Sequence, residues 1–440
     1  MTKENNKKEN ENYLLLQLNQ TRWLFFSLCC YLASQSITIP ILPIGPWALW
    51  PTLSDVAFVC LVFTFWKCRR FTVELSLPAK KIFLLLCIVF CGSIVSYISY
   101  QASADKGSSG SIFGAFQLYR LSVFFAIFWL TSKVPLTPKR LEVARWIVDG
   151  VLIFVCMGVF ITYAGLIPID SIVAHLPKVG PWQFYEGIAK SGGKQGLGFV
   201  GYNHAYVAAQ VIMLIGLRIH LALNQNQAIH NTILMVISLW IVFISESRSG
   251  LVSMVFFFLV YYLYKPTHAL WVITLSLVIT TLAIQIGWQS IELDSNEGSI
   301  IERQLTVLQA NKKENLSGRD ERWAAHLDSL DNNHINWFVG NGFGSAIDRG
   351  DNAHMLPLQI TSETGLIGLV IFSFLFYLIL RYLYQFEIGE KPIFWVTVTF
   401  LISAASQETF YPTPSLGQFI GFYLCSVAIA LRRKFSKEIS

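Results

Sequence analysis

Residues 243–260 read FISESRSGLVSMVFFFLV, two apolar runs joined by a short polar link that contains Glu246 and Arg248. Apolar runs of about 20 residues, the length that crosses a bilayer core as a helix, recur along almost the whole chain. Of the 440 residues, 54% are apolar and only 14% are charged, too few charges for the surface of a water-soluble protein of this length. The sequence therefore predicts an all-α integral membrane protein.

The apolar runs predict about twelve transmembrane helices. Their expected limits are 23–42, 53–67, 82–100, 112–132, 146–168, 202–223, 231–247, 250–264, 267–288, 356–384, 393–410 and 413–431. The chain then divides into a polar tail (1–22), the first nine spans (23–288) with an outer loop at 169–201, a large outer loop (289–355), the last three spans (356–431) and a basic tail (432–440). Within the large outer loop, helical spacing indicates that it is partly helical.

The distribution of lysine and arginine orients these spans. With a cytoplasmic N-terminus, the inner loops contain most of the basic residues, and the short outer links at 43–52, 101–111 and 411–414 contain almost none. Basic residues stay on the side that is not translocated, so both termini are predicted to be cytoplasmic. The net charge of +6 then reflects topology and contact with membrane lipids rather than nucleic-acid binding. The N-terminal tail has no small-residue cleavage site, so the first apolar run is expected to be retained.

No metal or other cofactor is expected. The eight cysteines lie in or beside apolar runs without metal-ligand spacing, which is typical of small buried side chains. The acidic residues of the large loop read as one charged helix face: Asp320, Glu321, Asp328 and Asp331. Asp149, near the cytoplasmic end of its span, is expected to be a structural polar residue.

Two arginines are placed against the topology. Arg248 lies between two apolar runs at the outer membrane surface, where a charge is costly enough to suggest function. Its planar fork of donors suits a phosphate or diphosphate, although a snorkelling arginine or a pair with Glu246 would also explain it. Arg120 lies about two turns inside its span, in SIFGAFQLYRLSVFFAIFWL. It is expected either to bind a lipid phosphate or to form a structural ion pair.

The first outer loop has a glycine-rich stretch around Lys194, SGGKQGLG, followed by Asn203 at the outer end of the next span. Glycine amides and a lysine can cradle an anion, although a solvated lysine on a flexible loop is the plainer alternative. The stretch is not a P-loop, because no Ser or Thr follows the lysine.

His354 ends the large outer loop, where the tenth span begins. Histidine can take up a proton near neutral pH, and its place on the same face as Arg248 and Lys194 favours a catalytic role over a merely polar one. His326 and His334 are expected to be solvated. Trp182, Trp323 and Trp337 are either sugar-stacking platforms or ordinary interface aromatics.

These stretches, in this order, resemble the O-antigen ligase and polymerase superfamily of bacterial envelope glycan enzymes. The resemblance rests on Arg248-Ser249-Gly250, on the R-x-x-x-W and G-x-G-x-G patterns at 319–323 and 340–344, and on His354 followed by the ETGLIGL stretch at 363–369. Residues 196–203, 43–46 and Asp55 also fit. Two departures are Lys194, where the family usually has an arginine, and Asn352, which precedes rather than follows the histidine.

The resemblance implies a fold similar to the GT-C-type membrane glycosyltransferases and a metal-independent, inverting transfer of a glycan from undecaprenyl diphosphate. The site would face the periplasm or cell exterior, in the bacterial inner membrane. His354 would act as the general base, and Arg248, with Arg120 or Lys194, would bind the diphosphate. Asn203, Arg319 and Arg322 would contact sugar or phosphate.

Three functions remain open at this point. The leading one is a repeat-unit polymerase, whose acceptor is another lipid-linked glycan and whose further partner is a chain-length regulator. The second is an O-antigen ligase with a lipid A–core acceptor. The third, of another class, is a transporter or lipid-linked glycan flippase, which predicts inverted repeats and midplane charges in both halves, and the sequence has neither.

Overall fold

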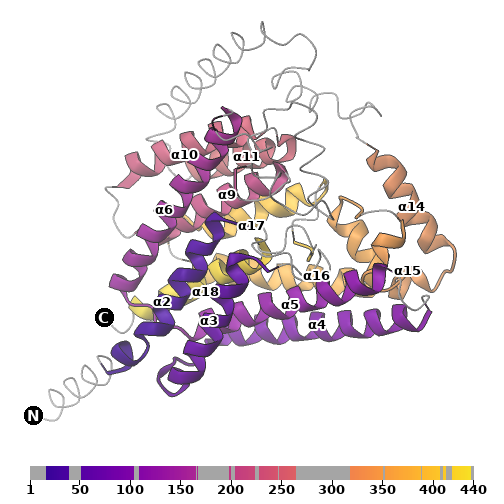
Figure 1. Cartoon of the computed structure of the whole chain (residues 1–440), viewed down its shortest axis with the longest axis horizontal. Helices are drawn as coiled ribbons and strands as arrows, with labels where there is room; N and C mark the ends of the chain where they lie inside the picture. Colours follow the sequence, from indigo (N-terminus) through magenta and orange to yellow (C-terminus); the bar gives the residue numbers. More distant parts are fainter. Residues whose placement is uncertain are drawn as a thin grey trace, which may run out of the picture.

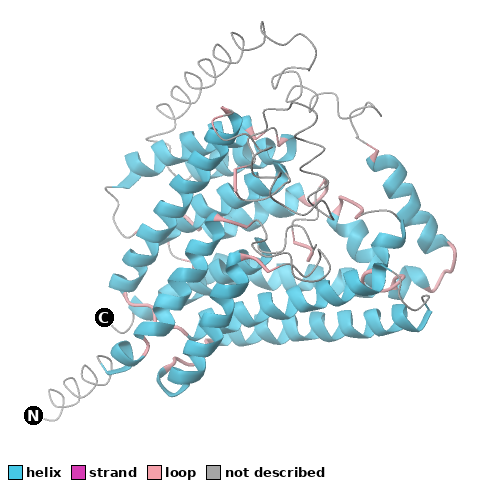
Figure 2. Ribbon diagram, in the orientation of Figure 1, coloured by secondary structure: helices cyan, strands magenta, loops and turns pink. Residues whose placement is uncertain are grey.

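The computed structural model describes residues 16–38, 51–103, 109–164, 166, 198–199, 204–222, 227–245, 247–263, 318–349, 352–387, 389–406, 410–412 and 419–437. Within these residues the regular secondary structure is helical, and no strand is present (Figure 2). The all-α class is therefore confirmed for the part of the chain that the structure describes.

The first part of the described chain forms α2 (Arg22–Ala33), η1 (Ser34–Ser36), α3 (Leu53–Cys68), η3 (Arg69–Phe71), α4 (Leu77–Ser103), α5 (Ser109–Lys133) and α6 (Pro138–Tyr163). Local signals fix two of these helix starts. Thr52 and Asp55 form a capping box at the start of α3. Thr137 caps α6, whose first residue is Pro138, a position that suits the fixed φ of proline. In Figure 1, α4 and α5 lie side by side along the lower edge of the molecule.

The middle part consists of α9 (His204–Leu221), α10 (Ala228–Ile244) and α11 (Arg248–Leu263). From Ala205 to Leu221 every residue of α9 is buried, because α6, α10, α11, α17 and α18 pack around it. A helix that is apolar on all sides belongs in a core. Glycine allows close helix contacts here, since a Cβ at Gly250 would overlap the Cβ of Ala208. Likewise, Gly216 of α9 faces Val396.

The last part consists of α14 (Arg319–Asp331), α15 (Asn336–Val339), η8 (Ser345–Arg349), α16 (Leu356–Phe386), α17 (Pro392–Ser403) and α18 (Phe419–Lys437). The helices α14 and α15 lie at the end of the molecule opposite the start of α2 and the end of α18 (Figure 1). The buried stretch of α18 packs along α5 and contacts α9, so these helices form the centre of the bundle.

Four of the described helices are long and apolar enough to cross a membrane: Leu77–Ala102, Gly110–Lys133, Pro138–Tyr163 and Leu356–Phe386. Shorter apolar helices cover Ala205–Leu221, Ile229–Ile244, Arg248–Tyr261, Pro392–Ser403 and Phe419–Arg432. These helices fall where spans were predicted, and they support an integral membrane protein. The predicted span at 267–288 lies outside the described residues. The number of spans and their orientation stay predictions.

The predicted span at 356–384 coincides with α16, within which Gly365 interrupts the regular helix with φ 69° and ψ −176°. The structure corrects two expectations. His326 is not solvated but fully buried, because α14 packs against α16. Cys60 and Cys91 are exposed on their helices, whereas the other cysteines are buried or half-buried. Asp149 is a structural polar residue as expected, paired with the buried Arg218 at 3.0 Å.

Candidate functional site

Arg248 is the first residue of α11. The Ser247 hydroxyl accepts a hydrogen bond from the Gly250 N–H (3.0 Å), and the Ser247 carbonyl accepts one from the Leu251 N–H (2.8 Å), so Ser247 caps the helix. The predicted polar link between two apolar runs is therefore a helix start. The half-buried Arg248 adds its positive charge to the positive end of the helix dipole, a combination that suits an anion.

His354 lies immediately before α16 and is half-buried. Its φ of 51° is in the left-handed region, which is uncommon for a residue with a side chain. Two residues on, the Leu356 N–H donates to the carbonyl of Ala404 (2.9 Å), just past the end of α17. α11 also packs against α17. Arg248 at the start of α11 and His354 before α16 are therefore both next to segments that contact α17 or its end.

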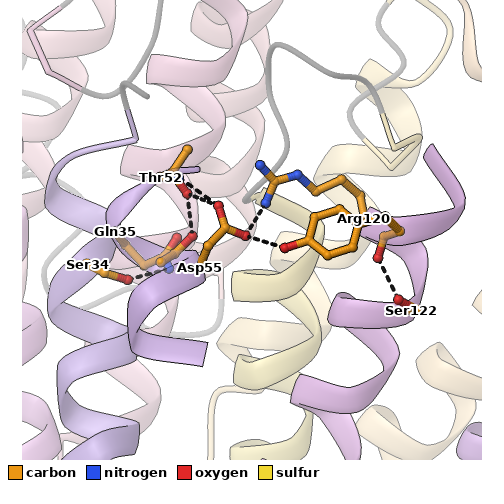
Figure 3. A network of polar contacts seen from close by, with 8 residues as sticks. Ser34, Gln35, Thr52, Asp55, Arg120 and Ser122 are labelled. Carbon is orange, nitrogen blue, oxygen red and sulfur yellow. Dashed lines mark hydrogen bonds and ion pairs between the residues drawn. The ribbon is translucent and has the colours of Figure 1, made fainter. Parts of the chain in front are cut away.

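Arg120 is in an ion pair. One Nη1–Oδ1 distance of 2.5 Å joins it to Asp55, and Arg120 is only 2% exposed. Asp55 also accepts hydrogen bonds from the Thr52 N–H (2.7 Å), the Thr52 hydroxyl (2.9 Å) and the Tyr119 hydroxyl (3.2 Å). Figure 3 shows the carboxylate between Thr52 and the guanidinium. Of the two predicted explanations for Arg120, the ion pair is present in the structure.

Arg319 and Arg322 lie in the first turn of α14 and are both half-buried. The Trp323 indole N–H on the same helix donates to the carbonyl of Ala353 (2.8 Å), so this tryptophan anchors backbone next to His354. Trp337 donates to Asp331 (2.9 Å) at the surface of the loop. Lys194, Asn203 and Trp182 lie outside the described residues.

The glycine pattern at 340–344 forms a turn that docks on the kink of α16. Gly340, Gly342 and Gly344 all have positive φ (77°, 103° and 97°). The N–H groups of Asn341 and Gly342 donate to the carbonyls of Ser362 (2.8 Å) and Glu363 (3.1 Å). A Cβ at Gly340 would overlap the Glu363 backbone, so only glycine fits here.

Glu363 is a residue that the sequence analysis did not single out. Its carboxylate is completely buried and accepts hydrogen bonds from the Ala346 N–H (3.2 Å) and the Tyr411 hydroxyl. Its backbone carbonyl also accepts from the Ser96 hydroxyl (2.8 Å) of α4. An acidic residue in an apolar run is a signal in itself, because a membrane-embedded charge is expensive. Glu363 thus joins the segment 342–346 to α4, α16 and the segment after α17.

The half-buried Arg349 and the buried His326 continue this network. The Arg349 Nε–H donates to Nδ1 of His326 (3.1 Å), which also lies 2.9 Å from the Ser362 hydroxyl. Burial lowers the pKa of the Arg349 guanidinium, and the nearby Glu363 carboxylate opposes that shift. Burial raises the pKa of the Tyr411 hydroxyl well above 10, and Glu363 raises it further. The loop is therefore attached by buried polar contacts rather than resting on the surface.

A groove of about 400 Å³ lies between α4 and α16, beneath the glycine turn. It exists because Gly92 and Gly368 line it, and a Cβ at Gly92 would meet no atom within 4 Å. Val95, one of the residues that line it, has an exposed apolar side chain (67%). In a membrane, such a groove is open to hydrocarbon chains.

Residues 233–373 match a family model described as O-antigen ligase. The resemblance to the O-antigen ligase and polymerase superfamily is confirmed. This family segment contains Arg248, Arg319, Arg322 and His354, whereas Arg120, Lys194 and Asn203 lie outside it. It also contains Glu363 and the glycine turn. The match supports a glycosyltransferase-like membrane enzyme that acts on lipid-linked glycans. No curated protein matches the chain.

Proposed function

We propose that this protein is a polysaccharide repeat-unit polymerase that transfers a glycan from undecaprenyl diphosphate to a sugar hydroxyl of another lipid-linked glycan. The observation that carries the proposal is the placement of Arg248 and His354 in the family segment, on elements that both contact α17. A cation at a helix start and a residue that can take up a proton are the two parts that this transfer needs.

In the proposed reaction, His354 takes the proton from the acceptor hydroxyl as its oxygen attacks the anomeric carbon of the donor sugar. The bond between that carbon and the diphosphate oxygen breaks with inversion, and undecaprenyl diphosphate leaves. Arg248 and the start of α11 bind the leaving diphosphate and stabilise its increasing negative charge. Arg319 and Arg322 contact sugar or phosphate from α14.

The groove between α4 and α16 supports a lipid-linked substrate, because an isoprenoid chain needs an apolar surface beside the polar site. The proposed orientation places this site on the periplasmic or outer face of the bacterial inner membrane. Lys194 and Asn203 belong to the proposal as residues that contact the donor from the first outer loop.

An O-antigen ligase is the second candidate, and the matching family model has that description. It would use the same donor and the same residues but a lipid A–core acceptor. Purified protein in bilayers with lipid-linked repeats alone distinguishes the two. A ladder of longer lipid-linked glycans supports the polymerase, and a product that forms only after lipid A–core is added supports the ligase.

Two substitutions test the roles of the residues. His354→Ala should abolish transfer while the protein stays folded in the membrane, and transfer near the wild-type rate would show that His354 is not the base. Arg248→Lys keeps the charge and loses the planar fork. It should impair transfer strongly, and normal activity would remove Arg248 from diphosphate binding. If neither product forms with the wild-type protein, but lipid-linked glycan crosses the bilayer, a flippase replaces both enzymes.

A further inference from the structure

The residue before His354 is held from both sides by side chains. Ala353 is completely buried, its N–H donates to Oε1 of Gln359 (2.7 Å), and its carbonyl accepts from the indole N–H of Trp323 (2.8 Å). Gln359 comes from α16 and Trp323 from α14. The two peptide groups that flank Ala353 are therefore fixed by two different helices, and we call Trp323, Ala353 and Gln359 the Ala353 clamp.

The clamp adjoins a strained backbone. His354 has φ 51°, and the left-handed conformation is unfavourable for a residue with a Cβ. Such strain persists only where the surroundings determine the conformation, and it gathers at functional sites. The two hydrogen bonds of the clamp fix the peptide groups on either side of Ala353 and so determine the conformation at this point.

Stability does not explain why position 359 is a glutamine. The Ala353 N–H requires an acceptor, so the oxygen of the amide faces Ala353 and the amide nitrogen points away. Gln359 is completely buried, and among the described residues its amide nitrogen has no hydrogen-bond partner. A buried donor without a partner is unfavourable enough to cancel what the bond to Ala353 contributes. What the glutamine does contribute is the position of the Ala353 peptide.

We infer that Trp323 and Gln359 are positioning residues that fix the backbone of His354, and through it the direction of the imidazole toward the acceptor hydroxyl. The inference rests on the proposed role of His354 as the base. It also gives the tryptophan of the R-x-x-x-W pattern a role other than stacking on sugar. Since an error of about 1 Å in the position of a reacting group can reduce a rate by roughly 100-fold, the clamp has a large effect on transfer without touching substrate.

Two variants open the clamp, one at each bond. Trp323→Phe keeps an aromatic ring and removes the N–H, and Gln359→Met keeps the length of the side chain and removes the acceptor. Each has a matched control. Trp337→Phe removes an indole N–H of the same loop that donates only to Asp331, and Thr361→Val removes a hydroxyl of α16 that donates to the carbonyl of Pro357 (2.8 Å).

The first measurement is hydrogen–deuterium exchange of the full-length protein in detergent or bilayers, followed on peptides that cover 352–356. Both clamp variants should speed exchange of these amides by roughly fivefold to tenfold, since one hydrogen bond is worth about 1 kcal/mol. Trp337→Phe and Thr361→Val should leave it unchanged. This readout does not depend on the activity, so equal exchange in all five proteins would overturn the clamp whatever reaction the protein catalyses.

The second measurement is transfer. Trp323→Phe and Gln359→Met should lower kcat about 10- to 100-fold with KM within twofold of wild type, at an unchanged unfolding temperature, while Thr361→Val keeps the wild-type kcat. Faster exchange with an unchanged kcat would show that the clamp does not position a base. A raised KM at a normal kcat would mean that these side chains bind substrate instead. If the wild-type protein transfers no glycan at all, the proposed function fails, and the exchange result still stands.

Discussion

The ion pair between Asp55 and Arg120 allows a quantitative test of the fold. Asp55→Ala leaves the Arg120 guanidinium, 2% exposed, without its opposite charge. Removing one member of a buried pair costs about 3–5 kcal/mol. The same change removes the acceptor that Thr52 uses at the start of α3, which adds about 1 kcal/mol. The expected loss is therefore about 4–6 kcal/mol.

A second variant separates the charge from the rest of the effect. In Asp55→Ala/Arg120→Met no charge is left unpaired, and the long apolar side chain fills the space of the arginine. Replacing both partners of a buried pair by apolar groups is often close to neutral, so the double variant should regain most of the lost stability. Glu142→Ala is the control, because it breaks a pair that is 4.0 Å apart and 55% exposed on the glutamate side. Exposed pairs contribute at most about 1 kcal/mol.

The assay is the temperature at which the purified protein in detergent loses its monodisperse peak after heating. With about 1 °C per kcal/mol for a chain of this length, Asp55→Ala should unfold about 5 °C lower than wild type. The double variant should recover more than half of that difference, and Glu142→Ala should stay within about 2 °C. If Asp55→Ala unfolds within about 2 °C of wild type, the two charges are not a buried, mutually dependent pair, and Arg120 is free for the lipid phosphate that the sequence also suggested.

Three further changes test the outer part of the bundle. Gly365→Ala should yield little folded protein, because φ 69° with ψ −176° is almost confined to glycine and a Cβ would overlap the carbonyl of Phe338. Gly318→Ala is the control and should be tolerated, because Gly318 has φ 73° and a Cβ there would meet no atom within 4 Å. Tyr411 has a raised pKa, so its contribution to stability is complete below pH 10, the ordinary pKa of tyrosine, and is lost as pH rises further. Between pH 8 and 11 the unfolding temperature should therefore fall more steeply for wild type than for Tyr411→Phe. Parallel curves for the two proteins would contradict this. Gly92→Leu should fold normally and lower transfer at least several-fold by filling the groove, whereas unchanged transfer would mean that no lipid chain binds there.

The sequence predicted best those helices whose formation is determined by local sequence. The helices α4 and α5 fall close to their predicted limits, because each is a continuous apolar run bounded by polar or basic residues, whereas α6 begins eight residues before its predicted start. Gly365 was missed for a physical reason. A glycine in an apolar run is compatible with a straight helix, and only the Phe338 carbonyl, which α15 brings to this point, requires a backbone without a Cβ.

The partners of charged residues were harder to predict than the residues themselves. Arg120 was recognised because a charge inside an apolar run needs an explanation, yet its partner Asp55 lies 65 positions earlier in the chain, and no periodicity relates two spans so far apart. His326 was predicted to be solvated because its helix is polar. It is buried because α14 lies against α16, where Ser362 provides a hydrogen-bonding partner. Both results depend on which helices pack together, and that information is tertiary.

The buried contacts of Glu363 bear on how the proposed site would work. A long outer loop in a membrane enzyme is readily imagined as a mobile cover over the substrate. Here the glycine turn, η8 and the segment at Tyr411 are all hydrogen-bonded to one buried glutamate of α16. Opening the described part of the loop would therefore expose the Glu363 carboxylate or leave it buried without its hydrogen-bond donors. Either result would reduce the stability by several kcal/mol.

That cost favours a fixed site over a moving one. His354 lies between this anchored loop and α16, its backbone held by residues of α14 and α16, and Leu356 is bonded to the end of α17. Groups that are already in place when the substrate arrives need no reorganisation as charge develops in the transition state, which is where most electrostatic catalysis originates. On this reasoning residues 318–349 act as scaffold for the proposed base, and substrate would enter beside them, through the groove between α4 and α16, rather than beneath them.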